Sequence, residues 1–223
     1  MTRLWKLAPI ALGLFSLAAV FVATGCGSSS ARARLLNAYL GQASLDMLIN
    51  NQSTATGVGY GAASGYASVS SGSPNLKIQG TGTNNVLVNQ TINISSGSDN
   101  TILSTGSGTV VLSDNNTAPA SGNIKIRVIN ASPTLGTADV YIVPSGTPIT
   151  PGSPTFASLA YQSASGYQSL AAGSYEIIFT FAGGPSAVID SNPLSFSAGQ
   201  IRTVVGLDGL NGGFTTAVLS DLN

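Results

Sequence analysis

The sequence predicts an all-β protein with two tandem immunoglobulin-like β-sandwich domains, placed after a cleaved N-terminal signal peptide. Three observations lead to this prediction. An apolar N-terminal leader ends at the single cysteine, Cys26. Five sequence blocks then recur in the same order in two halves of the chain. Beyond the leader, short runs rich in β-formers alternate with Gly, Pro, Asn and Ser turns, and no run has sustained helical periodicity.

The leader has the three parts of a secretory signal peptide. A basic start precedes the apolar run 7–22, and the small residues Ala23-Thr24-Gly25 stand directly before Cys26. This arrangement resembles a bacterial lipobox, so we expect cleavage after residue 25 and lipidation of Cys26. One alternative is a transmembrane helix, but that needs about 20 apolar residues, and this shorter run contains Pro9. The other is ordinary cleavage that leaves Cys26 unmodified.

A lipid on Cys26 would attach the protein to the membrane, and the Gly/Ser-rich residues 26–31 would form a flexible tether. Gly27, rather than Asp, follows Cys26. In the Gram-negative sorting pattern that this resembles, Asp at that position favours retention in the inner membrane. We therefore expect an exported protein anchored to the cell envelope, in the outer membrane where the cell has one. Whether it faces the periplasm or the cell surface is left open.

Composition excludes several classes of function. Only 7% of the residues are charged and the formal net charge is zero, so a nucleic-acid partner is not expected. The chain has no histidine, which removes His-based triads and most zinc sites. The single cysteine is used by the predicted anchor, which removes thiol catalysis. We expect no catalytic residue, no metal, no cofactor and no enzymatic activity.

The recurring blocks indicate two copies of one unit. The first copies are residues 32–38, 44–49, 60–66, 92–97 and 111–114, and the second copies are residues 125–131, 137–142, 161–167, 194–199 and 218–221. The expected organisation is a signal peptide over 1–25, the lipidated cysteine and tether over 26–31, a sandwich over 32–115, a linker over 116–123 and a second sandwich over 124–223.

Each copy is expected to contain about seven short strands. In the first copy, a strand begins at Arg32. In the second copy, Ile124–Val128 alternates apolar and basic residues, which is typical of a half-buried strand. Further strands are expected over residues 139–143, 175–181, 194–196, 202–205 and 216–219. Four prolines between residues 143 and 156 predict an irregular loop.

The blocks resemble a bacterial domain family of unknown function, DUF4397. The second copy carries its motifs at residues 127–133 (RVINASP), 138–141 (ADVY), 165–167 (SGY) and 172–175 (AGSY). The first copy lacks the Ser-Pro after Asn37-Ala38 and the Tyr of the last motif. Many family members have His where this chain has Asn37 and Asn130. The resemblance implies secretion and a β-sandwich, and it implies no activity.

Few carboxylates are candidates for a site. Asp46 and Asp139 occupy equivalent positions just inside a strand, where they could contact a ligand or calcium or could hydrogen-bond turn amides. We favour the structural interpretation. Asp114 and Asp221 end equivalent strands and are expected to be solvated turn residues, while Glu176 is expected to face solvent.

The tyrosines Tyr60, Tyr66, Tyr161 and Tyr167 form one pair in each copy. They could form a stacking platform for sugars, or they could pack in the core or on a sheet surface around a Ser-Gly turn. We favour packing.

These observations favour a lipid-anchored envelope protein that acts as a non-catalytic binding, adhesive or structural module. Its partners would be the membrane, through Cys26, and an envelope protein or glycan. One alternative is a carbohydrate-binding surface lipoprotein, which predicts tyrosine rings exposed on one face. Another is an unrecognised Asp or Ser hydrolase, which predicts two carboxylates in a concave pocket. The sequence leaves the ligand and the oligomeric state open.

Overall fold

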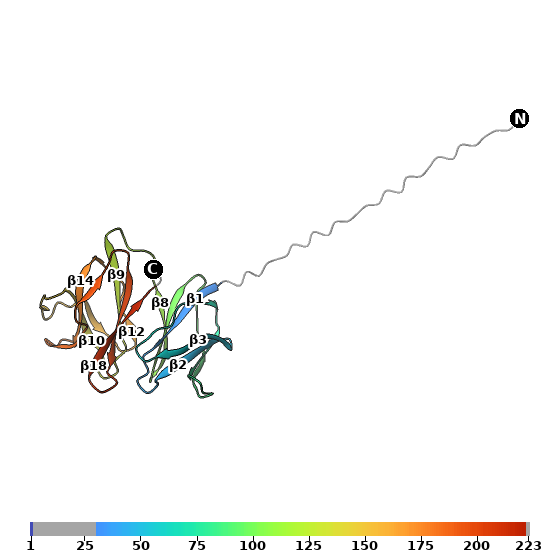
Figure 1. The fold of residues 1–223 in the computed structure, drawn as a ribbon, viewed down its shortest axis with the longest axis horizontal. Helices are drawn as coiled ribbons and strands as arrows, with labels where there is room; N and C mark the ends of the chain where they lie inside the picture. The colour runs from blue at the N-terminus through green and yellow to red at the C-terminus, as the bar shows by residue number, and fades with distance from the viewer. Residues whose placement is uncertain (2–29, 222–223) are drawn as a thin grey trace.

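The computed structural model describes Met1 and residues 30–221, so the predicted signal peptide and Cys26 lie outside the described residues. Residues 30–221 form β-strands, turns and loops, which confirms the all-β prediction (Figure 1). No helix in this part of the chain has the length and apolar character needed to span a membrane.

The first repeat consists of two four-stranded sheets. Its inner sheet has the order β4 (Ala67–Ser70), β1 (Ser30–Asn37), β7 (Asp99–Thr105) and β8 (Gly108–Asp114). Its outer sheet has the order β3 (Gln52–Gly59), β2 (Ser44–Ile49), β5 (Asn75–Gly80) and β6 (Val86–Thr91). All neighbours pair antiparallel except β1 and β7, which run parallel.

The second repeat has the same plan. In its inner sheet, β9 (Asn123–Asn130) pairs with β12 (Ser163–Ala164), β13 (Gln168–Ala171) and, in parallel, β17 (Ile201–Asp208), which pairs with β18 (Phe214–Ser220). In its outer sheet, β14 (Gly173–Phe181) pairs with β10 (Ala138–Pro144), β15 (Ala187–Asp190) and β16 (Leu194–Phe196), and β10 also pairs with β11 (Phe156–Leu159). The proline-containing segment between β10 and β11 forms no strand, as predicted.

Each repeat is a β-sandwich with its own apolar core between the inner and outer sheets, in agreement with the predicted fold class. In the first repeat, Leu35 and Ile102 of the inner sheet pack with Met47 and Ile78 of the outer sheet. Alternation in β2, where every second residue is buried, places the apolar residues on one face of the strand. The repeats contain eight and ten strands rather than about seven, because several are pieces of two to four residues that carry no periodicity to detect.

The two inner sheets also pack against each other. A third apolar cluster joins Leu36 and Leu103 of the first repeat to Ile129, Val205 and Leu207 of the second. The molecule is therefore a four-layer stack of sheets, with a buried junction between the repeats. The prediction that Ile124–Val128 is half-buried is wrong, because β9 is covered on one face by its own core and on the other by the first repeat.

Contacts across the junction define the relative direction of the repeats. Lys125, at the start of β9, donates to the carbonyl oxygen of Asn115, just after β8. At the other end, Tyr60 donates to the carbonyl oxygen of Asp208, the last residue of β17. Hence β1 and β9 begin at one end of the molecule, here called the base, and finish at the opposite end, here called the tip. The base includes Ser30, where the described chain begins (Figure 1).

Candidate functional site at the junction of the repeats

A closed ring of six polar side chains crosses the junction. Each repeat contributes one arginine, one tyrosine and one aspartate, and these alternate through ion pairs, hydrogen bonds and cation–π contacts. In order around the ring, they are Arg34, Asp221, Tyr167, Arg127, Asp114 and Tyr66. The reciprocal contacts mean that the repeats are related by an approximate twofold axis, as in a symmetric dimer interface.

The first half of the ring is centred on Arg34 of β1. Its Nη2 lies 2.5 Å from Oδ1 of Asp221, the residue that follows β18 in the other repeat. Its Nε donates to Oγ1 of Thr101, and its Nη1 donates to the carbonyl oxygen of Ser220. The guanidinium carbon lies 4.7 Å from the centre of the Tyr66 ring. The charge of Arg34 is thus partnered in every direction, although the side chain is only 1% exposed.

The second half repeats this geometry around Arg127 of β9. Its Nη1 lies 2.7 Å from Oδ1 of Asp114 and donates to the carbonyl oxygen of Ser113, both at the end of β8. Its Nε donates to Oγ1 of Thr203, and its guanidinium carbon lies 4.9 Å from the centre of the Tyr167 ring. Nη2 of Arg127 has no hydrogen-bond partner among residues 30–221. This half is therefore less completely bonded than the first.

The tyrosines close the ring. The Tyr66 hydroxyl donates to Oδ2 of Asp114 at 2.6 Å, and the Tyr167 hydroxyl donates to Oδ2 of Asp221 at 2.9 Å. The prediction that Asp114 and Asp221 are solvated is wrong: each lies in the junction and pairs with an arginine of the other repeat. The sequence places both at strand ends, but their burial depends on how the repeats dock.

Burial and charge explain the titration of the ring. Burial alone lowers the pKa of the Arg127 guanidinium, but Asp114, Tyr167 and Asp221 outweigh it, so this pKa lies above its ordinary value. Burial is the largest cause of the raised pKa values of the Tyr66 and Tyr167 hydroxyls, and the carboxylate that each one bonds raises its pKa further. The ring therefore retains its charges and protons at neutral pH.

The ring accounts for half of the tyrosines considered as a sugar platform. Tyr66 and Tyr167 each have an arginine against the ring and a hydroxyl bonded to aspartate, so neither offers a free stacking face and a free hydroxyl together. Tyr60 and Tyr161 are half-buried at the tip instead. Burial first, and then the neighbouring Asp208 and Tyr161, raise the pKa of Tyr60 to about 12.

Asp46 and Asp139 brace loops. Oδ1 of Asp46 accepts from the amide of Gly57 at 2.8 Å and from Oγ1 of Thr81 at 2.7 Å. The two oxygens of Asp139 accept from the amides of Ser158 and Gly183. These amides belong to neighbouring strands and turns rather than to the segment after Asn37 or Asn130. Within residues 30–221, no three His, Cys, Asp or Glu side chains gather to hold a metal ion.

Glu176 is half-buried on β14, and its Oε1 accepts a hydrogen bond from the amide of Gly146 in an exposed setting. This contact fits the outward orientation expected for the residue.

Asn37 and Asn130, where many relatives have His, have equivalent buried roles. Nδ2 of Asn130 donates to the carbonyl oxygens of Gly136 and Leu159, at 2.7 and 3.0 Å. Nδ2 of Asn37 donates to the carbonyl oxygen of Val58, and its Oδ1 accepts from the amide of Tyr39. An amide suits this site because it donates twice and accepts at once, with no charge to bury.

The base carries one pair of neighbouring carboxylates. Asp99 and Asp114 are cross-strand partners on β7 and β8, and both line a cavity of about 540 Å³. Arg32 binds both oxygens of Asp99, at 2.6 and 2.9 Å, and Asp114 is held in the ring. Each carboxylate is thus engaged by an arginine, so the pair does not favour general acid–base catalysis, and the hydrolase hypothesis gains no support from it.

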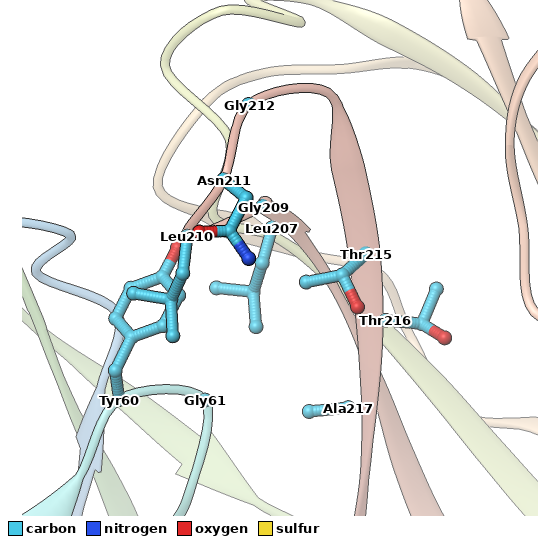
Figure 2. A pocket seen from close by; sticks show the side chains of 10 residues that line it. All are labelled: Tyr60, Gly61, Leu207, Gly209, Leu210, Asn211, Gly212, Thr215, Thr216 and Ala217. Atoms are coloured by element: carbon cyan, nitrogen blue, oxygen red, sulfur yellow. The ribbon is translucent and has the colours of Figure 1, made fainter.

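The tip carries two cavities at the junction. The larger, about 430 Å³, lies between Tyr60 of the first repeat and the β17–β18 turn of the second (Figure 2). The smaller, about 120 Å³, is lined by Tyr39, Tyr60, Tyr161 and Pro133, among others. Sequence analysis selected two of these tyrosines but missed the turn at 209–213, which was considered only as an unconvincing calcium loop.

Sequence alone held one unused signal for the ring. Its arginines and aspartates stand at matching positions in the first and last repeated blocks, although few charged residues occur in the chain. Retention of rare charges at equivalent positions predicts pairing.

Comparison with known proteins agrees with the repeat structure. The family described as "Domain of unknown function (DUF4397)" matches residues 31–141 and 138–223. The chain belongs to the DUF4397 family. The two matches correspond to two tandem DUF4397 copies, as predicted, although the first match extends past β9 into β10. No curated protein matches the chain.

Two solved structures resemble this DUF4397 protein weakly. One is CBMbc, a family CBM26 module of Amy13K from Eubacterium rectale, determined with maltoheptaose: it is 11% identical, with 87% of this chain and 98% of that chain covered and a TM-score of 0.31. The other is a leucine-rich repeat protein from Bacteroides thetaiotaomicron VPI-5482: it is 12% identical, with 78% of this chain and 25% of that chain covered and a TM-score of 0.20. At these TM-scores, neither likeness bears on the ligand of this chain.

Proposed function

We propose that this DUF4397 protein is a lipid-anchored, non-catalytic binding module of the bacterial cell envelope, with the tip as its contact surface. The observation that carries the proposal is the position of Ser30 at the base, opposite the two tip cavities. A lipid on Cys26 would hold the base against the membrane and direct the tip away from it.

Simple lengths support this orientation. Cys26 and Ser30 are separated by four Cα–Cα steps of at most about 3.6 Å, so the tether spans at most about 14 Å. A strand of eight residues, such as β1, adds about 26 Å. The tip would therefore stand clear of lipid headgroups, while the base cavity that includes Arg32 and Asp99 would face them. This favours the tip over the base as the place where a partner binds.

The docked repeats support a rigid role. The ring and the apolar cluster join the repeats into one body, so a groove between them at the tip keeps its shape. The carboxylates Asp114 and Asp221 hold the junction together, and Asp46 and Asp139 hold loops, which leaves none of these four for chemistry on a substrate.

Intact-mass analysis of the membrane fraction tests the anchor. We expect a mature chain that begins at Cys26 and carries acyl chains, together with loss of both acylation and membrane association in Cys26→Ser. Ser29→Ala is the matched control, because it alters the tether and keeps the cysteine. A soluble, unacylated wild-type protein would contradict the anchor and would make a freely secreted binding protein the better description.

A further inference from the structure

The larger tip cavity exists because the two repeats differ at one turn. The β7–β8 turn of the first repeat consists of Gly106 and Ser107 alone, whereas the equivalent β17–β18 turn spans residues 209–213. The longer turn extends beside Tyr60, across the junction, and encloses the cavity of about 430 Å³ (Figure 2). This volume lies within the range of small-molecule sites, about 300–1,000 Å³.

Glycines hold the longer turn in place. Gly212 and Gly213 have positive φ values of 88° and 68°, which other residues adopt only with strain. A Cβ on Gly209 would lie 2.6 Å from the carbonyl oxygen of Gly212. The Gly209 amide donates to the carbonyl oxygen of Gly213, which closes the turn at 2.8 Å. The turn is therefore a defined structure that sets the shape of the cavity.

The cavity has an apolar wall and polar groups opposite it. Tyr60 and Leu210 lie on one side, with Leu207 behind, while Thr215 projects from β18 on the other side and Asn211 reaches over the top (Figure 2). The Tyr60 hydroxyl is already bonded to the Asp208 carbonyl oxygen, so the residue presents mainly its ring. Leu210 is 69% exposed, which is unusual for an apolar side chain at the rim of a polar cavity.

The polar groups of the cavity are unengaged within the protein. The side chains of Asn211 and Thr215 make no hydrogen bond with any other part of residues 30–221. Together they supply an amide that donates and accepts and a hydroxyl that does both. No charged residue lines the cavity, so an ionic ligand would lose its hydration there without gaining a counter-charge.

We infer that this cavity binds a saccharide unit of a neutral glycan. Saccharides combine C–H faces, which pack on rings and aliphatic side chains, with hydroxyl groups that both donate and accept, and the cavity offers one partner for each. The inference rests on the proposed function only in taking the tip as the contact surface. A neutral peptide is the competing ligand, because it also lacks charge and forms hydrogen bonds of both kinds.

Calorimetric titration of the full chain, as the cell processes it and in mild detergent where it is membrane-bound, tests the inference. The probes are the hexasaccharides of cellulose, xylan, mannan, amylose and chitin, and a neutral hexapeptide of Ser, Asn and Gly. We expect at least one saccharide to bind at millimolar or lower concentration. Asn211→Ala should weaken binding about fivefold, the effect of one hydrogen bond. Asn84→Ala, at an exposed Asn in the β5–β6 turn, is the matched control and should change nothing.

A turn exchange gives the sharper test. Replacement of residues 209–213 by the Gly-Ser turn of the first repeat keeps Asp208 and Phe214 paired while removing the cavity. It should weaken saccharide binding about tenfold or more and leave the circular dichroism spectrum unchanged. If this variant does not fold, the double variant Asn211→Ala/Thr215→Val replaces it.

Three results would overturn the inference: no saccharide binds, binding survives both the turn exchange and the double variant, or only the peptide binds. Membrane fractionation reports separately on the anchor. Saccharide binding by a protein that is not acylated would refute the anchor alone.

Discussion

Replacement of Asp114 by Asn tests whether the ring holds the two repeats together. Asp114→Asn keeps the size of the side chain and removes the charge that faces Arg127, whose side chain is 1% exposed. Breaking a buried ion pair from one side costs about 3–5 kcal/mol, because the remaining charge is left without a partner. That is a large part of the stability of a typical domain, about 5–15 kcal/mol.

The control comes from the same sheet. Arg32 pairs with Asp99 through two hydrogen bonds, but its side chain is 49% exposed, so water can replace the partner. Arg32→Gln should therefore cost only about 0–1 kcal/mol. Urea unfolding followed by circular dichroism measures both values by linear extrapolation. For a chain of this length, the loss in Asp114→Asn corresponds to a fall in Tm of about 6–20 °C.

A double replacement separates the charge from the packing. Asp114→Leu with Arg127→Met removes both charges, so it should be far less destabilising than Asp114→Asn and could exceed the wild type in stability. The reasoning is refuted if Asp114→Asn costs no more than Arg32→Gln. It is also refuted if the double replacement is as destabilising as Asp114→Asn.

Two further predictions concern pH and core packing. Because the folded-state pKa values of Tyr66 and Tyr167 are raised, the stability that they contribute is complete below the unfolded value of about 10 and is lost as pH rises towards the folded values. Denaturant titrations above pH 10 should give a falling unfolding free energy, with a shallower slope in Tyr66→Phe/Tyr167→Phe; equal slopes would contradict the assignment. Gly206→Ala places a Cβ 2.8 Å from Cζ of Phe179 and should cost about 1–3 kcal/mol in thermal or urea unfolding. Gly65→Ala, with nothing within 4 Å of the new Cβ, should cost much less, and equal losses would argue against the close approach.

Much of the fold could be predicted from local sequence. Strand periodicity in β2 and the β-formers of β14 act over a few residues, so they identify strands wherever the strands pack. The repeated blocks revealed two copies of one unit. The exact number of strands was less predictable, because β12 has two residues and β16 has three.

The site was less accessible to sequence reasoning, because it lies where the repeats meet. Tyr60 and Tyr161 were selected as a pair, but their position at a tip cavity depends on the docking of the repeats and on the length of one turn. Asp114 was assigned to solvent because strand ends are usually exposed. Its burial results from Arg127, which is close in sequence but belongs to the other repeat.

By itself, the sequence determined the β class, the duplication and the family resemblance, because these depend on patterns within short segments and on comparison of one half with the other. Tertiary structure alone decided that the two sandwiches share a buried junction. The physical reason is that an apolar and basic alternation such as Ile124–Val128 suits a strand facing water as well as one facing another sheet. Only the positions of Asp114 and Asp221 across the junction show that the basic side chains pair with buried carboxylates.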